Sequence, residues 1–256
     1  MPSIYALFVA LALTPSSLAA PTLSKISARV AGGSISEPGQ FPFVVATQDN
    51  GEQLCGGTLL NAYTVLTAAH CSFNKLPQNV TVRAGSTLWH SGGVLSNISE
   101  IKIHPQYRPV MGQYDVSVWH LATPIQPSDT IGYAKIAGQG HDPPVGLQAT
   151  TAGWGDKSQD RTVPGSEELR FVNVPVVSRQ ACSIYGQISS LDLCAGGEEG
   201  KGSCPMDSGG PIWNAQTREI IGTVHSGGGC GLKDVPIMYT NLGGMSDWVI
   251  RNSWSA

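Results

Sequence analysis

The sequence of 256 residues predicts an all-β fold, and three observations support this. Short apolar and β-branched runs recur along the chain. Gly, Pro or Asn turns separate these runs, which is the spacing of antiparallel strands in a barrel or sandwich. The length allows one large β-domain or two small ones, each able to bury a sizeable core. The strand spacing alone does not distinguish a tandem pair of small barrels from one large β-domain.

Ten runs have the composition of strands, and two further segments favour helix. The strand-like runs span residues 43–47, 56–60, 64–69, 80–85, 99–104, 116–121, 149–154, 169–177, 219–224 and 237–242. The helical segments are a short one near residues 178–184 and a C-terminal one from about Gly243. In the C-terminal segment one helical face is shared by Met245, Trp248, Val249 and Asn252.

An apolar run over residues 4–13 lies near the N-terminus, and small residues and Pro21 follow it. A membrane-spanning helix needs about 20 apolar residues, so the shorter run is typical of a signal peptide. We therefore predict a signal peptide over residues 1–19 and a secreted, extracellular protein. The alternative is a short buried helix, for which the neighbouring sequence supplies no covering surface.

Charge and cysteine content restrict the partners. The chain has 15 basic and 18 acidic residues without a run of like sign, so we expect neither nucleic acid nor a membrane as partner. Six cysteines in an exported chain favour disulfides, and no C-x-x-C or H-x-x-x-H spacing indicates a metal site. We expect no metal and no cofactor. Asn79 and Asn97 begin N-x-S/T triplets, which predicts glycosylation on exposed loops.

Three polar residues have the chemistry needed to hydrolyse an amide bond. That reaction requires a nucleophile, a base, a group that orients the base, and donors for the developing oxyanion. His70 ends a strand in LTAAHC, Asp115 precedes an apolar strand in GQYDVSVWHL, and Ser208 stands in the glycine turn MDSGGP. In the alternative interpretation this set arises by chance, with a core histidine and a strand-capping aspartate.

These segments, in the order His, Asp, Ser, resemble the trypsin and chymotrypsin family of serine proteases. Five motifs of the family match in order from Val30 to about Trp254, and their sequences are most similar to those of fungal trypsins. They are RVAGG, CGGTLLNAYTVLTAAHC, AGWG, CAGG and DSGGP. The resemblance implies two antiparallel six-stranded β-barrels, a short intermediate helix and a C-terminal helix. It also implies a monomeric protease domain over residues 30–256. In it Ser208 is the nucleophile, His70 the general base and Asp115 the group that orients the imidazole.

The resemblance further implies an activation switch and three disulfides. Arg29 ends a propeptide over residues 20–29, and cleavage after it would free the Val30 amine to pair with the carboxylate of Asp207. The cysteine pairs implied by the family are Cys55–Cys71, Cys182–Cys194 and Cys204–Cys230.

The sequence departs from the family pattern beside the nucleophile. Met206 replaces a glycine whose backbone N–H, together with that of Ser208, forms the oxyanion hole. If the turn requires a positive φ at this position, a side chain costs about 1–2 kcal/mol that glycine avoids. A displaced donor lowers the rate of such enzymes by about 10²–10³-fold. We expect the turn to tolerate methionine with reduced activity.

The family's specificity pocket corresponds here to Gly202, Ser203, Gly227 and Ile237. Gly202 replaces the aspartate of trypsins, so a bound Lys or Arg side chain would lack a partner. Ile237 replaces a glycine and should shorten or fill the cavity. The pocket is therefore expected to accept small apolar substrate residues or none at all.

A further departure lies in VHSGGGC, where the family usually has Ser-Trp-Gly and this chain has His225, Ser226 and Gly227. His225 either donates to Asp115 in place of a serine hydroxyl or disturbs the site as an additional base. The missing tryptophan removes an apolar wall from the substrate groove.

Two functions follow from these motifs. One is a secreted serine endopeptidase, made as a zymogen and cleaved between Arg29 and Val30, with non-tryptic specificity. The other is a catalytically impaired homologue that acts as a binding or inhibitor protein. The complete set of catalytic residue types favours the enzyme, whose partners would be protein or peptide substrates and protein inhibitors. The binding or inhibitor protein is favoured by four departures from the family pattern: Met206, Ile237, His225 and Ser226.

Overall fold

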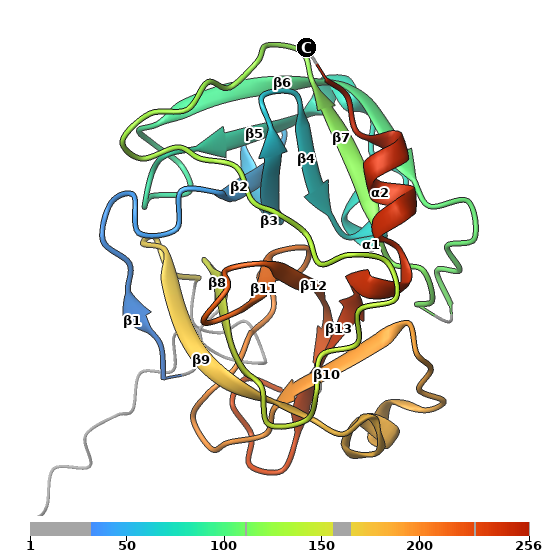
Figure 1. The fold of residues 1–256 in the computed structure, drawn as a ribbon. Coiled ribbons are helices and arrows are strands. Elements are labelled where there is room, and N and C mark those ends of the chain that lie inside the picture. The colour runs from blue at the N-terminus through green and yellow to red at the C-terminus, as the bar shows by residue number, and fades with distance from the viewer. Residues whose placement is uncertain (1–31, 111, 156–164, 228, 256) are drawn as a thin grey trace, which may run out of the picture.

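The computed structural model of the chain describes residues 32–110, 112–155, 165–227 and 229–255. Two antiparallel β-barrels of six strands each lie one above the other (Figure 1). This confirms the predicted fold class. The predicted signal peptide and propeptide, together with Arg29 and Val30, lie outside the described residues.

The first barrel closes in the order β2-β3-β4-β7-β6-β5. Its strands are β2 (Val44–Asp49), β3 (Glu52–Asn61), β4 (Thr64–Thr67), β5 (Val80–Ala84), β6 (Val94–Ile103) and β7 (Ser117–Leu121). Between β4 and β5 lie the short helix α1 (Ala69–Ser72) and the 3₁₀ turn η1 (Pro77–Asn79). In β5 the inward residues Val80, Val82 and Ala84 alternate with partly exposed ones, as a strand with one buried face requires.

The second barrel closes in the order β8-β9-β10-β13-β12-β11, with β11 paired back to β8. Its strands are β8 (Gln148–Gly153), β9 (Arg170–Val177), β10 (Asp192–Gly196), β11 (Pro211–Asn214), β12 (Ile220–Gly227) and β13 (Pro236–Asn241). A two-residue strand, β1 (Ser34–Ile35), adds to the edge of β9.

Strands β1, β10 and β11 were absent from the sequence-based expectation. β10 has the sequence DLCAG and β11 has PIWN, so neither shows a long β-branched run. Both are nevertheless buried over most of their length because neighbouring strands cover them. Tertiary pairing therefore defines these strands, whereas local propensity leaves them undetected.

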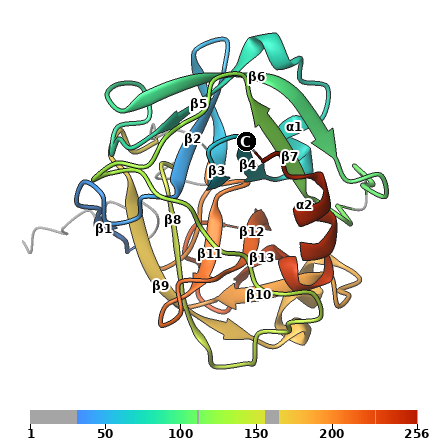
Figure 2. The same cartoon turned by 45° about the horizontal axis from the view of Figure 1, so that its top comes forward.

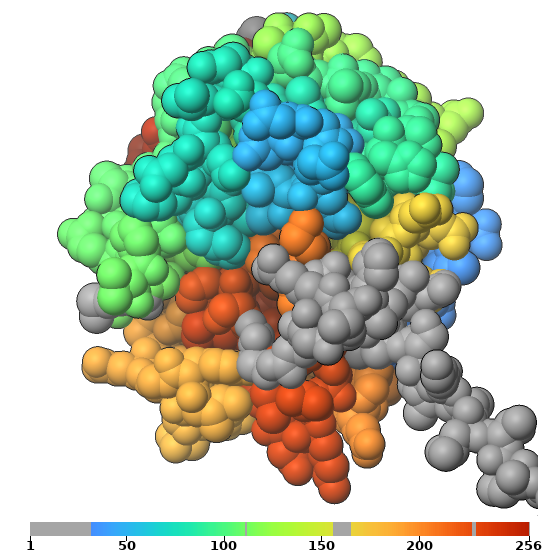
Figure 3. All heavy atoms as spheres, turned by 180° about the vertical axis from the view of Figure 1, so that it is seen from behind, coloured from blue at the N-terminus to red at the C-terminus, as the bar shows by residue number. Residues whose placement is uncertain are grey.

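The three largest hydrophobic clusters among the described residues make up most of the core. One fills the first barrel around Trp119 and Leu59, and another fills the second barrel around Tyr239 and Ile212. The third lies between the barrels and includes Trp213, whose ring centroid is 4.9 Å from that of Phe41 and 5.3 Å from that of Phe43. Viewed from behind, the first barrel in blue to green lies on the second in yellow to red (Figure 3). This packed interface brings loops of both barrels together.

The predicted helices are present. The intermediate segment forms a 3₁₀ helix, η2 (Arg179–Tyr185), and the C-terminal segment forms η3 (Leu242–Gly244) and α2 (Ser246–Asn252). Met245 and Val249 of the predicted face are buried. Although α2 follows the last strand of the second barrel, it lies beside the first barrel (Figure 2). None of the helices in these described ranges is long and apolar enough to cross a membrane.

His104, directly after β6, links this helix to the first barrel. Its ring centroid is 4.8 Å from that of Tyr114, on which it stacks, and 4.8 Å from that of Trp248 in α2. Burial lowers the pKa of His104, because the charged ring is poorly solvated there. The folded state therefore favours the neutral imidazole. This contribution to stability is complete above about pH 6.5, the pKa of an unperturbed histidine, and is lost as the pH falls toward the lower folded pKa.

We expect His104→Gln to weaken the dependence of Tm on pH between about pH 7.5 and pH 5, measured by calorimetry. The dependence should persist in part, because burial also lowers the pKa of His225. An unchanged slope in His104→Gln would show that this ring does not couple protonation to folding.

Candidate active site

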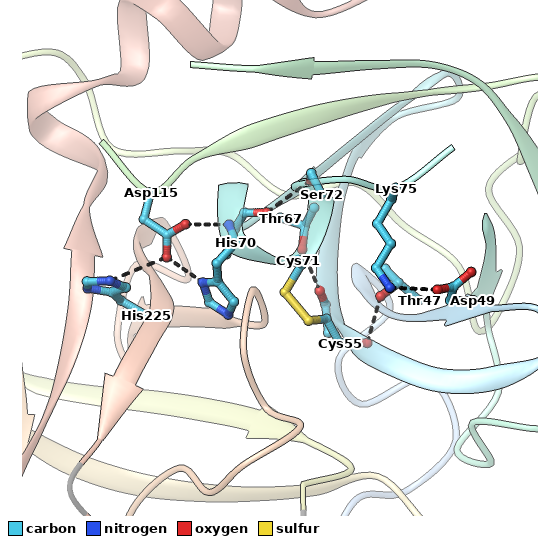
Figure 4. The surroundings of a disulfide bond; sticks show 12 residues. Thr47, Asp49, Cys55, Thr67, His70, Cys71, Ser72, Lys75, Asp115 and His225 are labelled. Carbon is cyan, nitrogen blue, oxygen red and sulfur yellow. Dashed lines mark hydrogen bonds and ion pairs between the residues drawn. A yellow bond between two sulfur atoms is a disulfide. The ribbon is translucent and has the colours of Figure 1, made fainter. Parts of the chain in front are cut away.

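Asp115 and His70 come from two segments of the first barrel and meet at its end. His70 lies in α1, directly after β4, and Asp115 lies two residues before β7. The Asp115 carboxylate is fully buried; its Oδ1 accepts the backbone N–H of His70 at 2.7 Å and its Oδ2 contacts His70 Nδ1 at 2.6 Å (Figure 4). Because a carboxylate can only accept, the ring proton lies on Nδ1. His70 Nε2 is then left with a lone pair, as a base requires.

Ser208 lies in the turn before β11, and this turn packs against the segment that leads to His70. A side chain at Gly209 would collide with Thr67 and Ala68, so only glycine allows this approach. The hydrogen bonds among the described residues include none between the Ser208 hydroxyl and His70. The structure thus joins His70 to Asp115 and places Ser208 on the neighbouring turn. Such contacts are often long without substrate.

A second buried carboxylate, Asp207, holds the nucleophile turn in place. Its Oδ2 accepts the backbone N–H of Cys204 at 2.8 Å, and its Oδ1 accepts the backbone N–H of Gly155 at 2.7 Å. Side chains at Gly153 or Gly155 would collide with this carboxylate, which explains both glycines of AGWG. Its predicted partner, the Val30 amine, lies outside the described residues. These bonds connect the turn to the end of β8.

A cavity of about 220 Å³ opens beside Ser208. Of the predicted pocket residues, Ser203 and Ile237 line it, whereas Gly202 does not. A Cβ at Gly202 would lie 3.4 Å from Ile237 Cγ1, so Gly202 adjoins the isoleucine that lines the cavity. Gly227 pairs with Ile237 across β12 and β13. The lining consists of Ser203, Cys204, Pro205, Met206, Ser208, Val224, His225, Ser226, Gly229 and Ile237.

The Trypsin family model matches residues 30–249. The chain belongs to the trypsin family of serine endopeptidases. Trypsin delta of Drosophila erecta is 32% identical over 237 residues, covering 90% of this chain and 91% of the relative. Trypsin alpha of Drosophila melanogaster is 33% identical with 90% of each covered, and trypsin alpha-4 of Lucilia cuprina is 33% identical with 88% of each covered. The predicted family is confirmed, while the likeness to fungal members stays a prediction.

The cavity beside Ser208 is lined by uncharged residues around Ser203. The Ser203 hydroxyl lies 3.1 Å from both Thr151 Oγ1 and the hydroxyl of Tyr239, so its hydrogen-bonding capacity is used inside the protein. Burial raises the pKa of Tyr239 and keeps its phenol neutral. Among the described lining residues there is no carboxylate to receive a cationic side chain.

Met206 has a φ of 73°, so this trypsin-family turn does place a side chain in the left-handed region. The turn is closed by backbone hydrogen bonds from Asp207 N–H to the Cys204 carbonyl at 3.0 Å and from Gly210 N–H to the Asp207 carbonyl at 2.9 Å. The turn therefore does require a positive φ at position 206, as considered from the sequence. Methionine incurs a strain of about 1–2 kcal/mol there relative to glycine. The sequence revealed the anomaly but could not supply the backbone angle.

His225 lies on the other side of Asp115 from His70 (Figure 4). Its Nε2 is 3.7 Å from Asp115 Oδ2, beyond hydrogen-bond length, and its ring centroid is 6.2 Å from that of His70. Burial lowers the pKa of His225, the nearby Asp115 partly opposes this shift, and His70 adds to it. Two imidazoles therefore face one buried carboxylate in this member of the family.

The three predicted disulfides are present. Cys55–Cys71 ties β3 to α1 beside His70, and Cys182–Cys194 ties η2 to β10. Cys204–Cys230 joins the turn that contains Ser208 to the segment after β12.

Among the described residues, the one cluster with metal-ligand spacing is Cys55, His70 and Cys71. Its sulfurs are bonded to each other, so this cluster cannot bind a metal as thiolates do.

Asn79 and Asn97 are both exposed, as glycan attachment requires. Neither lies in an irregular loop: Asn79 ends the 3₁₀ turn η1 and Asn97 lies within strand β6. The expected loop location is therefore wrong, because the solvent-facing side of a barrel strand offers the same exposure. Glycosylation at both positions stays a prediction.

We expect Met206→Gly to raise kcat for a peptide ester by at least about fivefold and to raise Tm, because the left-handed backbone strain is removed. Met206→Ala is the matched control, since it keeps the Cβ atom and therefore the strain. Steady-state kinetics and thermal unfolding measure both effects. Equal gains from glycine and alanine would assign the effect to side-chain length instead of backbone conformation.

Proposed function

We propose that this trypsin-family protein is a secreted serine endopeptidase, activated by cleavage after Arg29, that cleaves beside small apolar residues. The observation with the greatest weight is the buried Asp115 carboxylate, which receives two hydrogen bonds from His70. A buried charge of this kind is costly unless it has partners. Its pairing with a partly exposed imidazole next to the Ser208 turn is what a general base requires.

In the proposed reaction, His70 Nε2 removes the proton from the Ser208 hydroxyl as its oxygen attacks the scissile carbonyl. Asp115 stabilises the imidazolium that forms, and the backbone N–H groups of Met206 and Ser208 donate to the oxyanion. The imidazolium then returns its proton to the leaving amine. Water, activated by the same imidazole, hydrolyses the acyl-enzyme and restores Ser208.

We base the proposed activation by cleavage after Arg29 on the contacts that surround Asp207. This carboxylate is buried, and its two bonds to backbone N–H groups connect it to the turn that contains Met206 and Ser208. A new Val30 amine pairing with it would add a positive charge to the same buried position. Cleavage after Arg29 would thereby order the oxyanion donors.

We expect a fluorophosphonate probe to label Ser208 after cleavage at Arg29–Val30 and to label the intact chain much more slowly. His70→Ala should abolish labelling, because the hydroxyl loses its base. Mass spectrometry of the labelled peptide identifies the residue. An absence of labelling in the cleaved wild-type protein would reject the enzyme and favour a binding or inhibitor protein, the function that the departures Met206 and His225 suggest.

We base the proposed specificity on Ile237, which is 2% exposed and lines the cavity that Gly202 does not reach. Peptides with Ala or Val before the scissile bond should be cleaved and those with Lys or Arg should not, because a buried cation would have no partner. Ile237→Gly should admit longer side chains. Rapid cleavage after Arg by the wild type would overturn this pocket assignment.

A further inference from the structure

We infer that His225 is a positioning residue that donates its Nε2–H to Asp115 Oδ2 during the reaction, as the outer partner of the carboxylate that holds His70. The inference rests on the proposed roles of His70 and Asp115. It assigns His225 a function other than filling space or acting as a second base.

The first argument is the hydrogen-bonding capacity of Asp115. An ionised carboxylate has about four lone-pair sites, and a fully buried one loses its water at all of them. The side-chain oxygens of Asp115 have two hydrogen-bond donors among the described residues, and both belong to His70. The Nε2 atom of His225 also faces Oδ2, at 3.7 Å on the side opposite His70 (Figure 4).

The second argument is the tautomer of His225. Its Nδ1 is buried and has no hydrogen-bond partner. With the proton on Nδ1, a donor would be left unsatisfied and the Nε2 lone pair would face a carboxylate. With the proton on Nε2, the N–H faces Asp115 Oδ2 at 3.7 Å, and the buried Nδ1 carries a lone pair instead of an unpartnered donor. The second arrangement is electrostatically favoured, and burial keeps the ring neutral by lowering its pKa.

The third argument is how the backbone aims the ring. The pairing of β12 with β13 shifts register between Val224 and Ser226, so His225 occupies an irregularity that redirects its side chain. Gly112 lies against the ring from the loop after β6, and a side chain there would overlap the imidazole. Gly112 has a φ of 64°, and its N–H donates to the Arg108 carbonyl at 2.7 Å. Strand and loop together confine the ring beside Asp115.

The contact needs to shorten by about 0.8 Å to reach hydrogen-bond length, and catalytic contacts commonly tighten when substrate binds. When His70 accepts the proton of Ser208, Asp115 must remain ionised to stabilise the imidazolium. An additional N–H on Oδ2 favours the ionised carboxylate at that moment. The expected effect is therefore on kcat, with little effect on KM.

The kinetic test compares two variants of similar size. His225→Gln retains an amide N–H that can reach Asp115, whereas His225→Leu fills the space without a donor. We expect His225→Leu to lower kcat by about 10–100-fold with KM changed less than about threefold, the range typical of one hydrogen bond to a charged group. His225→Gln should restore most of this loss. Equal kcat values in the two variants would overturn the inference, since space-filling alone would then account for His225.

A spectroscopic test is independent of turnover. The full chain, cleaved at Arg29, is labelled with [¹⁵N]histidine, and the His225 ring signals are assigned by their absence in His225→Gln. We expect a neutral Nε2–H tautomer near neutral pH, and a change in the Nε2 shift when a phosphonate occupies Ser208. A Nδ1–H tautomer would overturn the inference. A Nε2–H tautomer in a protein whose Ser208 cannot be labelled would instead reject the proposed function while retaining the contact.

Discussion

The whole site depends on burying one negative charge. Asp115 is inaccessible to solvent, and an unpaired carboxylate in such a place would be strongly destabilising. The two hydrogen bonds from His70 offset that cost, and they require α1 and the start of β7 to meet in a fixed register. The Cys55–Cys71 disulfide and the closed first barrel maintain this register. The contact between Asp115 and His70 thus both stabilises the fold and orients the His70 ring.

The second barrel uses the same principle around Asp207. This buried carboxylate leaves no room for side chains at Gly153 and Gly155, and it fastens the turn that contains Ser208. A turn tethered in this way can hold Met206 in a left-handed conformation, because the surrounding contacts outweigh the local strain. The geometry of this turn is maintained by packing that a flexible loop could not provide.

The departures from the family pattern lie close together in space. Met206, Ile237 and His225 all line the cavity beside Ser208, although they come from a turn and two different strands. Each concerns one feature of the site: the backbone conformation next to Ser208, the lining of the cavity, and the surroundings of the buried aspartate. The barrels and disulfides that support the site match the family expectation, so the differences concern chemistry and selectivity more than folding.

The sequence alone determined the all-β class, most strands, the C-terminal helix and, through the family resemblance, the cysteine pairs, because these follow from local periodicity and from ordered motifs. It did not reveal β10 and β11, since their short sequences become strands only when neighbouring strands cover them. It identified Met206, Ile237 and His225 as unusual without saying what they do. Tertiary structure decided that Met206 has a positive φ, that Ile237 and not Gly202 lines the cavity, and that His225 faces Asp115. Those outcomes depend on angles and distances between segments far apart in the chain, which no local pattern encodes.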